Sequence, residues 1–300
     1  MSLLADRLSN QLRVDTAEGK SQSASENTAL SWFSRAIFVH LIAKSILNLK
    51  EGYTDEALTI FEILICGISV IGLLPSYLRL AASAVSLLLL CELAFLFPLG
   101  ANHRYVEIFC CVVLAVYSIS DKKEAELMGT ILRFMAIAVL FYSGMQKLLH
   151  GWYFRGEMLT ELVARRGEFT DVLGWTLPAS ELERIKLLGT VDYETGPFRP
   201  QGAPLFIFAS NLVYITELLA AVMLFSRRFR KIGAFFALAV VLGIELGARE
   251  VTFGALMLNL ILLHLRPPWQ MIGLILTAIL YGYCVAMSFN LVPKFFMTTA

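Results

Sequence analysis

Lys147 is the first candidate for a reactive residue in this sequence, because its amine lies at the end of a long apolar run. The run, 127–149, is long enough to cross a bilayer, which takes about 20 mainly apolar residues. A lysine in such a run is costly unless it is paired, hydrated or used. Loss of water favours a neutral amine, and a general base must be neutral. Lys147 is therefore the first candidate for proton transfer.

A second interpretation of Lys147 needs no chemistry. A lysine near the end of a span can extend its ammonium to the membrane surface, where Trp152 and Tyr153 would join an aromatic belt. Arg133 lies in the same run, and along a helix it is about 21 Å from Lys147. We therefore expect the two cations to lie in two separate sites. We expect Arg133 to form a structural ion pair with Glu217, or with a comparable acid, on a facing helix.

The composition indicates a polytopic membrane protein. Hydrophobic residues make up 57% of the chain and charged residues 16%, which leaves little for a soluble domain. The apolar runs predict an all-α transmembrane bundle of about nine spans, or about eight if the first helix lies on the membrane surface. The predicted helices cover 29–49, 57–74, 77–97, 105–118, 127–149, 205–225, 232–247, 251–265 and 271–292.

The chain divides into a tail and one membrane domain. Residues 1–28 are polar and predict a disordered cytoplasmic tail, whereas 29–300 predict the transmembrane domain. Within it, 151–203 predicts an extracytoplasmic loop with amphipathic helices near 157–165 and 180–188, and a loop of this length could be a lid. Arg35, His40 and Lys44 lie loosely on one side of the first helix. That helix is either a span turned inward or a helix on the membrane surface.

The basic residues set the expected orientation. A cluster of Arg227, Arg228, Arg230 and Lys231 between two predicted spans places that loop, and the N-terminus with it, in the cytoplasm. A net charge of +1 gives no electrostatic signal for a nucleic-acid partner. We expect a multi-pass protein of the bacterial inner membrane, with the lipid bilayer as its main partner.

Several ionisable residues lie at the depth of Lys147 under this topology. They are Glu62, Glu92, His103, Glu107, His150, Glu245 and Arg249. Together they could form a proton-handling pocket, although His103 is equally typical of a membrane interface and the buried acids of structural ion pairs. The four histidines lack metal-ligand spacing, and the five cysteines lie in apolar runs, so we expect neither a metal site nor a disulfide framework.

One motif around Lys147 is similar to that of a known family. The spacing Tyr142-x-Gly144-x-x-Lys147, followed by Trp152 and Gly156, resembles the signature of the HTTM membrane domain, which includes the vitamin K-dependent gamma-carboxylases. The resemblance implies that Lys147 is the catalytic base that deprotonates a hydroquinone. It also implies a quinone or hydroquinone ligand at Tyr142 and Trp152, and a carboxylase-like lyase activity.

Two further segments extend the resemblance. Asn102-His103-x-Tyr105 is similar to the Asn-His-x-Tyr segment of the family, whose histidine has an active-site role, and 242–245 resembles the family's late helix. The resemblance therefore implies that His103 and Glu245 assist Lys147.

Two classes of function follow from these features. The first is a membrane enzyme that acts on a quinol or another lipid-soluble substrate. The second is a non-catalytic membrane subunit that binds a lipid or belongs to a larger membrane-protein complex, which the lack of a segment like the carboxylases' lumenal domain favours. A transporter is the third alternative, because intramembrane charges also suit transport, but the sequence shows no repeat pair. Phosphate-binding, esterase and dinucleotide motifs are absent from the sequence.

Overall fold

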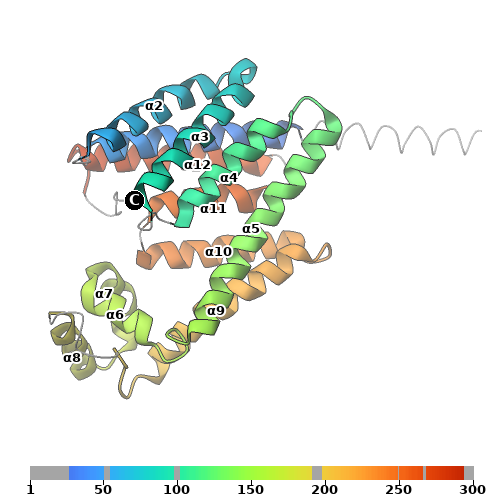
Figure 1. Cartoon of the computed structure of the whole chain (residues 1–300). Coiled ribbons are helices and arrows are strands. Elements are labelled where there is room, and N and C mark those ends of the chain that lie inside the picture. Colours follow the sequence, from blue (N-terminus) through green and yellow to red (C-terminus); the bar gives the residue numbers. More distant parts are fainter. Residues whose placement is uncertain are drawn as a thin grey trace, which may run out of the picture. The chain divides into compact units, whose positions relative to one another are not determined.

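The structure is a computed structural model that describes residues 27–50, 55–97, 102–190, 198–248, 250–265 and 268–293. All regular elements in these ranges are helices (Figure 1), which confirms the all-α prediction. Residues 1–26 of the predicted tail lie outside the described ranges. The chain forms two compact units, of which the first holds Met1–Arg133 with Leu265–Val292 and the second holds Phe134–His264.

The first unit is built around the N-terminal helix Asn27–Lys50. With it are α2 (Glu56–Gly72), α3 (Leu78–Leu96), α4 (Asn102–Val116), the beginning of α5 (Lys122–His150) and α12 (Pro268–Ser288). Helix α3 packs against both α2 and α4 (Figure 1). Gly72 brings α2 close to the N-terminal helix, because a Cβ there would collide with the ring of Phe38. The N-terminal helix is therefore an inward-facing part of this unit.

The second unit holds the rest of α5 and six further helices. These are α6 (Glu157–Arg165), α7 (Gly167–Leu173), α8 (Ala179–Gly189), α9 (Pro204–Phe225), α10 (Arg230–Ala248) and α11 (Val251–Leu262). Helix α10 packs against α7, α9 and α11. The helices begin and end at suitable residues: Asp121 accepts the backbone N–H of Lys123 at the start of α5, and Gly151, with a φ of 70°, ends it.

The segment between α5 and α9 has its own small core. Leu159 and Val163 of α6 pack with Ile185 of α8 and Phe206 of α9. Helix α6 coincides with the amphipathic helix predicted at 157–165, and α8 lies within a residue of the one predicted at 180–188. Gly189 allows α6 and α8 to touch, because a Cβ there would collide with the backbone carbonyl of Ala164.

Five helices in the described residues are long and apolar enough to cross a membrane. They are Asn27–Lys50, Pro75–Leu96, Lys122–His150, Pro204–Phe225 and Pro268–Ser288. The structure thus supports a multi-pass membrane protein. The helices α2, α4 and α11 have 17, 15 and 12 residues, fewer than the about 20 of a usual span, and α10 is not among the five candidates. The expected count of about nine spans therefore stays a prediction.

Candidate functional site

Lys147 forms a tight ion pair in the second unit. Its Nζ lies 2.7 Å from Oε1 and 2.8 Å from Oε2 of Glu217, and 2.6 Å from Oγ of Ser143. The Ser143 hydroxyl in turn donates to Oε1 of Glu217 at 3.2 Å. The side chain of Glu217 is 3% exposed and that of Lys147 is 18% exposed, so the pair is shielded on the Glu217 side and partly open at the amine.

This pair corrects the expected partner of Glu217. We predicted an ion pair with Arg133, but Arg133 precedes Lys147 on α5 by about 21 Å of helix. The reason is that α9 begins beyond the end of α5: Ser210 of α9 donates to the backbone carbonyl of Tyr153 at 2.6 Å. Glu217, two turns further along α9, therefore lies level with Lys147.

Helices α5 and α9 approach closely beside the pair. A Cβ at Gly144 would lie 2.8 Å from Cγ of Leu218 and 3.1 Å from the backbone oxygen of Tyr214. A small residue at such a crossing lets two membrane helices come together, which brings Lys147 within reach of Glu217. The glycine of the Tyr-x-Gly-x-x-Lys motif thus has a packing role here.

Tyr153 covers Lys147 from the segment that follows α5. The Nζ of Lys147 lies 5.5 Å from the centre of the Tyr153 ring, a distance typical of a cation–π contact. Burial, together with the nearby Glu217 carboxylate, raises the pKa of the Tyr153 phenol to about 12. The phenol therefore stays protonated at neutral pH.

A cavity of about 620 Å³ adjoins Lys147 and Tyr153. Its wall is mainly apolar and comes from α6, α7, α9 and α10, with Phe169, Phe236 and Val240 among its members. Arg166 and Glu250 also line this cavity and face each other at 3.8 Å. We call it the Lys147 cavity. An apolar space with a few polar groups at one place is typical of a small-molecule site.

None of the other sequence-predicted site residues is among those of the described ranges that line the Lys147 cavity. Glu245 packs against Gly254 of α11, and it is not among the described residues that line the Lys147 cavity. Tyr142 is 72% exposed, and Trp152 lines a different hollow of the same unit. His103 belongs to α4 of the first unit, where its Nε2 is buried without a hydrogen-bond partner among the described residues.

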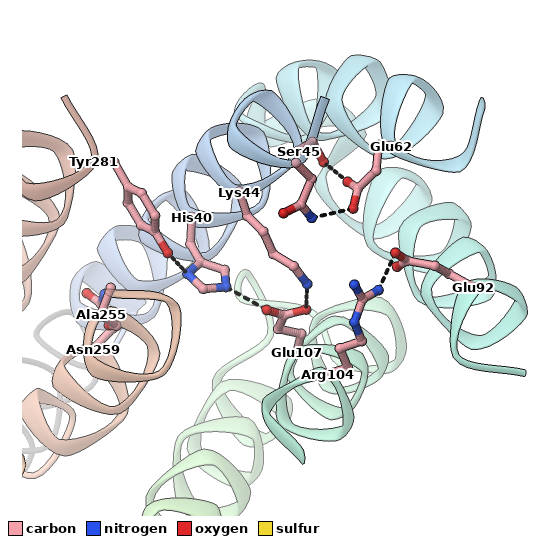
Figure 2. Close-up of polar contacts among 11 residues, drawn as sticks. His40, Lys44, Ser45, Glu62, Glu92, Arg104, Glu107, Ala255, Asn259 and Tyr281 are labelled. Atoms are coloured by element: carbon pink, nitrogen blue, oxygen red, sulfur yellow. Dashed lines mark hydrogen bonds and ion pairs between the residues drawn. The ribbon is translucent and has the colours of Figure 1, made fainter. Parts of the chain in front are cut away.

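A second polar cluster lies inside the first unit (Figure 2). His40 and Lys44 of the N-terminal helix both bond Glu107 of α4, at 2.9 Å and 2.6 Å. The other ring nitrogen of His40 lies 2.6 Å from the hydroxyl of Tyr281 on α12. All four side chains are at most 3% exposed. This buried network joins three helices, and we call it the His40 network.

Two further acids of the first unit are also paired. Glu62 of α2 accepts from Ser45 and from Asn48 at 2.6 Å each, and Glu92 of α3 forms an ion pair with Arg104 of α4. These acids were expected beside Lys147 in an outer cluster. Within the first unit, Glu62 ties the N-terminal helix to α2, and Glu92 ties α3 to α4 (Figure 2).

The sequence carried a weak signal for the His40 network. His40 and Lys44 are one helical turn apart, and their inward direction was one of two interpretations of the first helix. No group of His, Cys, Asp or Glu side chains in the described ranges is arranged to hold a metal ion. Comparison with models of known protein families, with curated proteins and with solved structures gives no match for this chain.

Proposed function

We propose that this membrane protein is an enzyme of the HTTM type that acts on a quinol or another lipid-soluble substrate, with Lys147 as its general base. One observation carries the proposal: the amine of Lys147 adjoins a cavity of about 620 Å³ with mainly apolar walls while it bonds a shielded acid. A lysine that only reached the membrane surface would need neither the cavity nor the acid.

The chemistry needs a neutral amine. A proton that passes from Nζ to the Glu217 carboxylate, over 2.7 Å, leaves an amine and a carboxylic acid without changing the net charge of the pair. The amine can then take the proton of a phenolic O–H in the cavity, so that an N–H bond forms as the O–H bond breaks. The resulting phenolate faces an ammonium, with Tyr153 nearby as a neutral hydroxyl.

His103, Glu245, Tyr142 and Trp152 keep the roles that the family resemblance gives them. For these four residues the proposal rests on the resemblance alone. Contacts within the second unit support only the roles of Lys147, Ser143 and Glu217.

A non-catalytic membrane subunit is the second candidate. The same ion pair supports it, because intramembrane charges are often retained as structural pairs between helices. In that case the Lys147 cavity would hold a lipid as a permanent part of the fold or of a larger assembly.

Two substitutions of Lys147 separate these candidates. Lys147→Arg keeps a positive charge on a group that stays protonated, whereas Lys147→Ala removes both the charge and the base. Each variant is placed in liposomes with a ubiquinol or menaquinol in air-saturated buffer, and oxidation of the quinol to the quinone, with dioxygen as the two-electron acceptor, is followed by absorbance. The matched control is Lys186→Arg and Lys186→Ala on the exposed face of α8.

The enzyme candidate predicts that both Lys147 variants lose turnover while they stay folded and the Lys186 variants keep it. Full activity in Lys147→Arg would contradict a base role. Quinol binding without turnover in the unsubstituted protein would favour the non-catalytic subunit.

A further inference from the structure

We propose that a hollow in the segment between α5 and α9 binds the phosphate group of an anionic membrane lipid. The hollow has a volume of about 690 Å³, and its wall includes Trp152, Arg155, Arg165, Arg166, Phe198 and Arg199. We call it the arginine pocket. It lies wholly within the second unit and does not include Lys147.

Positive charge dominates the arginine pocket. Its four arginines face Glu157 and Glu161 in the wall and Glu250, which lies 3.8 Å from Arg166, so one positive charge remains. Guanidinium groups are suited to phosphate because they offer several N–H donors in one plane. A phosphate diester with one negative charge would therefore enter a pocket of opposite sign.

Glu157 arranges two of these arginines. Its Oε1 accepts from Nε of Arg199 at 2.7 Å and lies 3.0 Å from Nε of Arg155, and its Oε2 accepts from Nη2 of Arg155 at 3.0 Å. The Glu157 side chain is only 10% exposed, whereas those of Arg155 and Arg199 are 48% and 61% exposed. One shielded carboxylate thus holds two guanidiniums that keep further N–H donors for a ligand.

The place of the pocket in the chain points to a lipid rather than a solute. Arg155 follows shortly after His150, where α5 ends, and Arg199 precedes Pro204, where α9 begins. Both helices are candidate spans, so these residues lie at a membrane surface, where lipid phosphates are found. Trp152 is 55% exposed, which is typical of an aromatic side chain at that level.

The wall of the pocket also offers apolar surface. Met158 and Leu162 of α6 line both the arginine pocket and the Lys147 cavity. Phe198 stacks on Arg165, with the guanidinium carbon 5.4 Å from the ring centre. A lipid can use this surface for the glycerol and the first carbons of its chains, whereas inorganic phosphate cannot.

The test compares lipids on the purified full-length protein. Native mass spectrometry in detergent follows the binding of phosphatidylglycerol, phosphatidylcholine and inorganic phosphate. We expect phosphatidylglycerol to bind more tightly than phosphatidylcholine, and we expect Arg155→Gln with Arg199→Gln to weaken it about tenfold or more. The matched control is Arg227→Gln with Arg228→Gln, which removes two exposed charges from the α9–α10 connection.

Several results would overturn the proposal. Equal binding of the two lipids, or an equal loss in the control, would show that the pocket does not select an anionic headgroup. Phosphate that binds as tightly as phosphatidylglycerol would show a site for a free anion instead. If the double variant does not fold, Arg199→Gln alone keeps the contacts between Arg155 and Glu157 and must still weaken the lipid. None of these outcomes depends on the role of Lys147.

Discussion

The ammonium nitrogen of Lys147 on α5 lies 2.7 Å from one carboxylate oxygen of Glu217 on α9 and 2.8 Å from the other. Because the two charges cancel, the membrane segment carries the pair at a lower cost than either residue alone. Any change to one residue therefore also changes the state of the other. Stability and activity measurements on this site need both single variants and the double variant.

The first prediction concerns the stability of this pair. Lys147→Met or Glu217→Leu alone leaves an unpaired charge and should lower the free energy of unfolding by about 3 to 5 kcal/mol. The double variant should lie close to the unsubstituted protein. Unfolding in mixed detergent micelles, followed by circular dichroism, measures the difference. Single variants as stable as the unsubstituted protein would show that water already compensates the charge.

The second prediction concerns the crossing at Gly144. Gly144→Ala puts a methyl group 2.8 Å from Cγ of Leu218 and 3.1 Å from a backbone oxygen, so the helices must shift. We expect a loss of about 1 to 3 kcal/mol in the free energy of unfolding. Leu218→Ala in the same chain should recover part of it, because the closest atom belongs to that side chain.

Gly67→Ala is the matched control for the second prediction. A Cβ at Gly67 meets no atom within 4 Å, so alanine should be neutral or should stabilise α2 by up to about 1 kcal/mol. If Gly144→Ala and Gly67→Ala have the same effect, the close approach of α5 and α9 does not limit the fold.

The positions of the helices could be predicted from the sequence, but the partners of their charges could not. The apolar runs mark where the helices begin and end. For example, the helix predicted at 205–225 is Pro204–Phe225 in the structure. Glu217 was predicted at the depth of Arg133 because its position in the membrane was counted from the ends of the predicted spans, but it lies level with Lys147. Ser210, six residues into α9, is level with Tyr153, so α9 begins beyond the end of α5, and no local pattern records such an offset.

The His40 network shows the same limit over a longer distance in the chain. His40 is 67 residues from Glu107 and 241 residues from Tyr281. The turn-like spacing of His40 and Lys44 indicates a polar side of the first helix, but it does not say which helices cover that side. Tertiary packing alone brings these partners together.

The third prediction concerns Tyr281, at one end of the His40 network. Tyr281→Phe removes the hydroxyl that lies 2.6 Å from Nδ1 of His40 and leaves that buried nitrogen without this partner. We expect the free energy of unfolding to fall by about 1 to 3 kcal/mol. Tyr105→Phe makes the same atomic change at a half-exposed side chain of α4 and should have little effect. Equal effects of the two would argue against a buried network.

The last prediction concerns acid and the segment of α6 to α8. Arg184 donates to both carboxylate oxygens of Glu181, at 2.6 and 2.8 Å, and the backbone N–H of Gln201 donates at 2.7 Å. The hydrogen bonds from Arg184 lower the pKa of Glu181 below its ordinary value of 4.5, against the opposing effect of burial. A lowered pKa in the folded state means that the ionised form stabilises the fold above pH 4.5, and that this contribution is lost as the pH falls through the lowered value.

Hydrogen exchange in α8, corrected for the intrinsic rate at each pH, measures this loss between pH 7 and pH 3. We expect protection to fall with acid in the unsubstituted protein. Glu181→Gln, which cannot ionise, should already show reduced protection at pH 7 and a smaller further change. Glu183→Gln, at an exposed neighbour on the same helix, should behave like the unsubstituted protein. If Glu181→Gln kept the full acid response, the response would come from other carboxylates, because the substituted side chain no longer titrates.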